Sequence, residues 1–195
     1  MYKFFFTGAF ICFCIVTGCR NHASTAEDGS NTEDTTAVAF FPVTAFLKGQ
    51  IAELDSIQVT PLRRITVNNK TDSVWLKKED IKALLAPFFT DEINESNMVS
   101  LFKVNKFNDQ SVNAVTFTYD PLKELPDTVH LRHWDIYINP QTGKITKLYI
   151  VKAAGDSILQ LTWQTDKWAK ITSLKESATG EKQLIKEDQV IWDLK

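Results

Sequence analysis

The chain has 195 residues, and its 22 Lys and Arg against 24 Asp and Glu give a formal net charge of only −2. This near-neutral balance lacks the clustered basic charge that nucleic-acid binding requires, so we expect no nucleic acid among its partners. The length fits one globular domain after a short leading segment.

The first residues have the layout of a secretory signal peptide. Lys3 precedes an apolar run from Phe4 to Val16, and the small residues Thr17 and Gly18 follow it. A membrane-spanning helix needs about 20 apolar residues, and this run is shorter. The pattern therefore favours a signal peptide at residues 1–18 over an uncleaved transmembrane anchor.

The segment Val16-Thr17-Gly18-Cys19 resembles a bacterial lipobox. In lipoproteins a diacylglycerol is attached to the lipobox thiol, and a signal peptidase then cuts before the cysteine. The resemblance implies that Cys19 is lipidated and holds the chain at a membrane. Because Arg20 stands where Asp would favour inner-membrane retention, it also implies an outer-membrane anchor. The acidic pair Glu27-Asp28 lies some distance from Cys19, so a periplasm-facing location is favoured over the cell surface.

A polar tether is predicted between the anchor and the domain. Residues 20–38 are mostly Asn, Ser, Thr, Ala, Glu, Asp and Gly, and they show no apolar periodicity. Such a segment behaves as a flexible chain with a span of roughly 25 Å. We therefore expect the lipidated cysteine and tether at 19–39 and a single domain at 40–195.

Two amphipathic helices are predicted in the first half of this domain. The apolar stripe Val43, Phe46, Leu47, Ile51 and Leu54 predicts a helix over about 42–55. A second stripe, with Ile81, Leu84, Leu85 and Phe88, predicts another, which Pro87 should end or kink. A hairpin is expected between them, because Asn68 to Thr71 has turn chemistry between two β-prone segments.

From residue 99 onward the apolar period changes to two, which is typical of strands. Strands are expected at 99–107, 111–119, 130–139, 144–152, 157–164, 168–175 and 188–194. The short turns between them predict an antiparallel meander, in a flat or a curved sheet. The predicted fold class is therefore α+β, with two N-terminal amphipathic helices packed on the sheet.

The hairpin at 130–152 has the most informative pattern. Its stretch from Ile136 to Ile145 resembles a hairpin of PepSY-type exported domains, although turn chemistry alone also explains it. Counting outward from the turn pairs Ile138 with Ile145 and Trp134 with Tyr149. The face assigned to the core therefore carries Trp134, Ile136, Ile138, Ile145, Tyr149 and Val151. The other face is unusually apolar, which predicts either cover by the protein itself or a binding surface. Its tentative binding residues are Leu131, His133, Asp135, Tyr137, Leu148 and Ile150.

Motifs for catalysis or metal binding are few. The sequence has no Gly-x-Ser-x-Gly, P-loop, dinucleotide-binding or His-Glu-x-x-His motif. All three cysteines lie at or before Cys19, and His130 and His133 should face opposite sides of a strand, so we expect no metal and no cofactor. His133 and Asp135 could form an acid–base pair. Of the five tryptophans, about three are expected in or beside the core.

These features leave three functions open. A lipid-anchored, periplasm-facing binding or assembly module without catalytic activity needs only the features above. A carrier of a hydrophobic ligand, held between sheet and helices, is the alternative. A small hydrolase using His133 and Asp135 is less favoured. The predicted partners are the membrane, through lipid on Cys19, and a protein or hydrophobic ligand.

Overall fold

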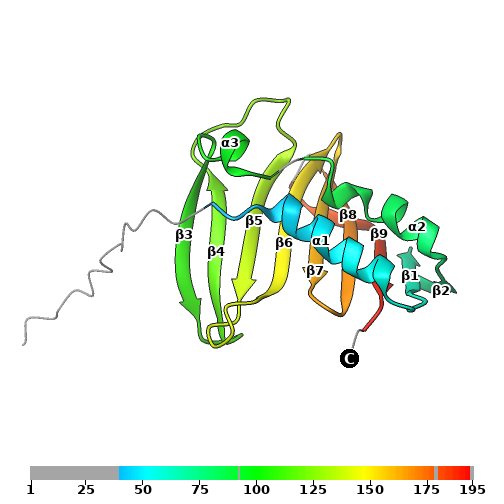
Figure 1. The fold of residues 1–195 in the computed structure, drawn as a ribbon. Helices are drawn as coiled ribbons and strands as arrows, with labels where there is room; N and C mark the ends of the chain where they lie inside the picture. The colour runs from blue at the N-terminus through cyan, green and yellow to red at the C-terminus, as the bar shows by residue number, and fades with distance from the viewer. Residues whose placement is uncertain (1–39, 92, 178–179, 194–195) are drawn as a thin grey trace, which may run out of the picture. The chain divides into compact units, whose positions relative to one another are not determined.

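The computed structural model describes residues 40–91, 93–177 and 180–193. The predictions for the signal peptide, Cys19 and the tether lie outside these residues. In the described part, nine strands form one antiparallel sheet, and α1 (Val43–Ser56) and α2 (Lys78–Leu84) lie on the same face of it (Figure 1). The predicted α+β class is confirmed.

The strand order across the sheet is β2-β1-β9-β8-β7-β6-β5-β4-β3. Strands β3 to β9 follow one another as neighbours, which is the predicted meander. The early hairpin joins this meander through antiparallel pairing of β1 with β9. The strands are β1 (Leu62–Val67), β2 (Lys70–Trp75), β3 (Phe102–Asp109), β4 (Ala114–Pro121), β5 (Leu131–Ile138), β6 (Ile145–Ala154), β7 (Ser157–Gln164), β8 (Trp168–Glu176) and β9 (Lys182–Ile191).

Both predicted helices are present, and each buries its apolar stripe against the sheet. In α1 the buried positions include Val43, Leu47 and Leu54. Helix α2 is shorter than its stripe, and the 3₁₀ helix η1 (Ala86–Phe88) follows with Pro87 inside it. Proline has no amide hydrogen to continue an α-helix, which explains this change of helix type. The short α3 (Glu95–Met98) was not predicted, because one turn is too short for a periodic signal.

Aromatic packing fills the space between the two layers. The ring of Trp134 stacks on Tyr119 with 4.4 Å between centroids, and the edge of Phe88 packs against Trp163 at 5.6 Å. Trp192 lies 5.0 Å from Trp163 and is also buried. Three of the five tryptophans are therefore in the core, as predicted, whereas Trp75 on the edge strand β2 is 68 % exposed.

The predicted face assignment of the β5–β6 hairpin is wrong for five residues. Leu131, Leu148 and Ile150 were placed on the face opposite the core, but each is fully buried in the core cluster. Leu148 pairs with Ile136, and Ile150 pairs with Trp134. The expected core residues Tyr149 and Val151 lie on the other face. The aliphatic half of the predicted binding surface is thus part of the helix–sheet interface.

Two β-bulges cause this difference. The turn is as predicted, since Ile138 pairs with Ile145 and Asn139 exchanges hydrogen bonds of 2.9 Å with Gly143 and Lys144. The register then shifts between Tyr137 and Ile138, which leaves Thr146 as the extra residue on β6. A second shift, between Leu131 and His133, returns Leu131 to the core face. A one-residue shift moves every following side chain to the opposite face.

Candidate functional site

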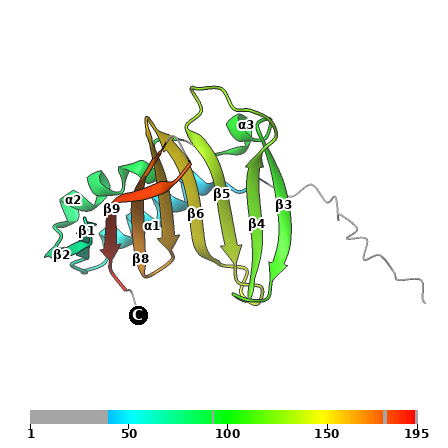
Figure 2. The same ribbon diagram turned by 180° about the vertical axis from the view of Figure 1, so that it is seen from behind.

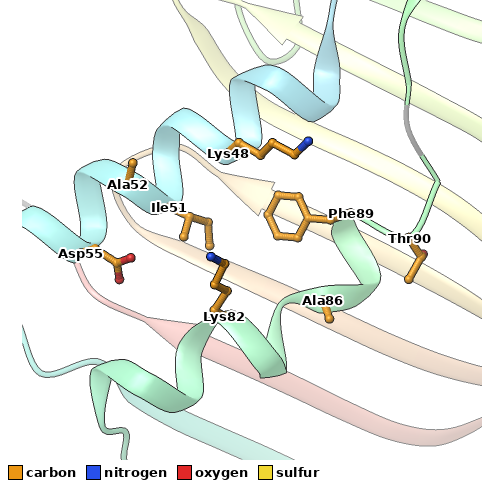
Figure 3. Close-up of a pocket in the computed structure, with 8 residues that line it drawn as sticks. All are labelled: Lys48, Ile51, Ala52, Asp55, Lys82, Ala86, Phe89 and Thr90. Atoms are coloured by element: carbon orange, nitrogen blue, oxygen red, sulfur yellow. The ribbon is translucent and has the colours of Figure 1, made fainter.

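The first candidate site is a groove between α1 and α2, with a volume of about 460 Å³. Figure 3 shows side chains from both helices along it, and the segment after η1 closes one end. We call it the interhelical groove. Its lining residues are Lys48, Ile51, Ala52, Asp55, Lys82, Ala86, Phe89 and Thr90.

Helical periodicity positions these residues. On α1, Lys48, Ile51, Ala52 and Asp55 follow the spacing of three and four that places side chains on one face of a helix. On the facing segment the lining positions begin at Lys82 and recur one turn later at Ala86. Each stripe lies beside the buried stripe of its helix, so the groove borders the core.

Two lysines fix the segments that border the groove. Lys78, at the start of α2, donates hydrogen bonds from Nζ to the carbonyl oxygens of Asp55 (3.1 Å) and Ile57, beyond the end of α1. Lys152 on β6 fixes the segment after η1. Its Nζ donates to the Pro87 carbonyl at 2.8 Å, and it lies 3.1 Å from a carboxylate oxygen of Asp91.

The side chain of Lys152 is only 3 % exposed, and it points to the helix-covered face. Its ammonium is also 3.1 Å from the hydroxyl of Thr90, a groove residue. Burial lowers the pKa of Lys152, because water no longer solvates the charge, while Asp91 opposes this shift. The three oxygen partners compensate for lost hydration and hold the end of the groove.

The lining of the groove combines an apolar floor with charged walls. Ile51 is buried and Phe89 is half-buried, whereas the small side chains of Ala52 and Ala86 leave the space open. Lys48 stands on one wall and Lys82 on the other (Figure 3). Within the described residues, neither ammonium makes a hydrogen bond or an ion pair.

The second candidate lies on the sheet face away from the helices, which Figure 2 shows from behind. His133 on β5 is bonded at both ring nitrogens. Its Nδ1 is 2.9 Å from an oxygen of Asp120, and its Nε2 is 3.1 Å from an oxygen of Asp135. Thr118 also donates to Asp135 at 2.7 Å. Together with Tyr137 and Tyr149, these residues form what we call the His133 cluster.

The carboxylates of Asp120 and Asp135 favour the protonated, charged form of the His133 ring. The hydrogen bond to Asp135 raises the pKa of His133, burial opposes this change, and the contact with Asp120 adds to it. Burial acts to raise the pKa of Asp135, but hydrogen bonds from His133 and Thr118 outweigh it, so the net shift is downward. A protonated His133 satisfies both acids at once, because both of its ring nitrogens then carry hydrogens.

This geometry does not suit general base catalysis. A catalytic base needs a ring nitrogen within reach of the proton that it removes, and both nitrogens of His133 are engaged with carboxylates. The structure thus brings together His133, Asp135 and Tyr137 of the predicted surface, but in an ion-paired cluster. Among the described residues, there is no group of three or more His, Cys, Asp or Glu side chains that could hold a metal.

Sequence reasoning missed the interhelical groove and both lysines that border it. Neither Lys78 nor Lys152 was singled out as a site residue, because lysines in proteins are ordinarily exposed. Arg63 was not singled out either, and its Nε donates to Asp188 at 2.8 Å. One sequence signal could have found Lys152: it follows Ile150 by two residues on the same strand, so the two side chains lie on the same face of the sheet.

No protein family model, curated protein or solved structure matches this chain. No helix in the described part of the chain is long and apolar enough to cross a membrane.

Proposed function

We propose that this chain is a lipid-anchored binding module without catalytic activity, held at the outer membrane by acyl chains on Cys19 and facing the periplasm. In this proposal α1 and α2 are the two amphipathic helices at the start of the folded domain. The tether at 19–39 then leads directly into α1, which forms one wall of the binding site.

The interhelical groove is the observation that supports binding. Ligand sites in proteins are concave, mostly apolar and lined by a few polar groups, with volumes from about 300 to 1,000 Å³. The groove has these properties, and Lys78 and Lys152 fix the segments beside it without filling it. A site of this size suits a small ligand or one side chain rather than a broad protein interface.

The alternative function, a carrier of a hydrophobic ligand, requires the ligand to lie at a different place from the one predicted. A ligand between sheet and helices would need space beside residues such as Leu47, Phe88 and Trp163. These side chains are 0–1 % exposed, so no water-sized space touches them. Their packing favours a hydrophobic ligand in the interhelical groove, not between the layers. The hydrolase alternative gains no support from the engaged nitrogens of His133.

Filling the groove tests the binding proposal. Leucine is a good helix former, so Ala52→Leu with Ala86→Leu should occupy the groove and leave folding nearly unchanged. The matched control is Ala45→Leu with Ala83→Leu. Ala45 is exposed on α1, Ala83 is exposed on α2 three residues before Ala86, and neither lines the groove. We expect native mass spectrometry to detect a bound small molecule on the wild-type and control chains, and not on the filled variant. Equal occupancy of all three chains would place the ligand elsewhere.

Metabolic labelling tests the anchor separately. A fatty-acid analogue should label the wild-type chain and fail to label Cys19→Ser, because the lipid is attached through that thiol. Equal labelling of both chains would refute the proposed anchor without bearing on the groove.

A further inference from the structure

We infer that the interhelical groove binds a single-chain amphiphile with a carboxylate head group, of the fatty-acid type. This inference rests on the proposed function, since it assumes that the groove is a binding site. It adds the chemical class of the ligand, which follows from the apolar floor and from the charges on the walls.

The floor of the groove matches a hydrocarbon chain. Ile51 and Phe89 present apolar surface between the facing segments (Figure 3), and the small side chains of Ala52 and Ala86 also line the groove. Removing a methylene chain from water is favourable in proportion to the apolar area buried. The hydroxyl of Thr90 offers little to a polar ligand, because it donates to the Pro87 carbonyl at 3.2 Å and accepts from Lys152.

The walls select the charge of the head group. Lys48 and Lys82 lie on opposite sides of the groove, and Asp55 is the single acid among the lining residues. The lining therefore carries one net positive charge, although the chain as a whole has a net charge of −2. This local reversal of sign favours an anionic head group over a cationic one.

Lys48 and Lys82 are available for a ligand, in contrast to Lys78 and Lys152. Lys78 is engaged with the carbonyls of Asp55 and Ile57 at the end of α1, and Lys152 is engaged with Pro87, Thr90 and Asp91. Lys48 and Lys82 have no such partner among the described residues. A carboxylate placed between them would gain two charge-assisted hydrogen bonds while its chain covers the apolar floor.

Three ten-carbon probes that differ only in the head group test the inference. Decanoate, decanol and decyltrimethylammonium would be titrated by calorimetry into the full chain carrying Cys19→Ser, which removes the proposed acylation site. We expect decanoate to bind at least about tenfold more tightly than the other two probes. Lys48→Gln with Lys82→Gln should remove this preference. The matched control is Lys103→Gln with Lys182→Gln, which changes the net charge equally at exposed strand positions and should retain the preference.

The outcomes separate this inference from the proposed function. If all three probes bind equally and the lysine variant behaves as wild type, while Ala52→Leu with Ala86→Leu abolishes binding, the groove is a site and the inferred head group is wrong. If no probe binds, or if the filled variant binds all of them as well as wild type does, both the inference and the groove as a binding site are overturned. A decanoate preference that only the lysine pair removes supports the inference.

Discussion

Substitution of Leu148 distinguishes the observed register of the β5–β6 hairpin from the one expected by counting outward from its turn. Leu148 is fully buried and pairs with Ile136 on one side and Trp163 on the other. Leu148→Ala leaves a cavity between two large side chains, Ile136 on β5 and Trp163 on β7. Buried leucines of this kind lose about 3–4 kcal/mol of unfolding free energy on truncation to alanine.

The neighbouring Val151 provides the control, because it lies half-buried on the opposite face of β6. We expect Val151→Ala to cost about 1 kcal/mol, since less apolar surface is lost and no enclosed cavity forms. Urea unfolding of both variants would measure the difference, and the melting temperature of Leu148→Ala should fall by roughly 10 °C. The unbulged register predicts the reverse order, because it places Val151 in the core. A larger loss for Val151→Ala than for Leu148→Ala would therefore refute the structure of this hairpin.

Three further predictions follow from the charged groups and the domain boundary. The raised pKa of His133 means that its contribution to stability is complete below pH 6.5, its value in the unfolded chain, and is lost as pH rises through the folded value. The lowered pKa of Asp135 means that its contribution is lost as pH falls below about 4. The difference in unfolding free energy between wild type and His133→Gln should thus be largest near pH 5–6 and shrink by pH 9, and a difference that grows with pH would contradict this. Lys152→Met should lower the unfolding free energy by about 2–4 kcal/mol in urea unfolding, because it leaves Asp91 without its cation. Asp91→Asn should lower it by less, and equal losses for the two variants would argue against the pairing. Residues 40–195 alone should give one cooperative melt that EDTA and reducing agents leave unchanged, and a large EDTA-induced drop would reveal a metal site.

Much of the fold could be predicted because its elements carry regular periods. The stripes of α1 and α2 have helical spacing, and seven β-segments alternate over enough residues to be recognised. The start of β9 was missed, because Lys182 to Ile185 are exposed and show no buried face. The described residues begin at Phe40, so the place of α1 as the first helix of the chain stays a prediction.

The faces of the central hairpin were misassigned because a period of two was assumed to continue without interruption. The buried residues of β5 are Leu131, Trp134 and Ile136, and those of β6 are Ile145, Leu148, Ile150 and Lys152. Each set contains one spacing of three, which is the sequence signature of a bulge. The Thr146 bulge is stabilised locally, since the Thr146 hydroxyl donates to the Tyr137 carbonyl at 3.2 Å and its own carbonyl accepts from Gln164 at 2.9 Å. The predicted binding surface on this hairpin depended on the register, so its residues could not be assigned to a face from alternation alone.

The interhelical groove was beyond sequence reasoning for a different reason. An amphipathic stripe indicates which side of a helix meets the sheet, but it does not set the distance between two helices on the same sheet. Here two contacts distant in sequence hold the segments beside the groove: Lys78 joins α2 to the end of α1, and Lys152 joins β6 to Pro87 in η1. Lys78 and Lys152 donate hydrogen bonds to backbone oxygens. These bonds hold the neighbouring segments in place without adding side-chain bulk between the helices. The same two contacts that complete the packing therefore leave the space between Ala52 and Ala86 open, with the unpaired Lys48 and Lys82 of the described structure at its walls.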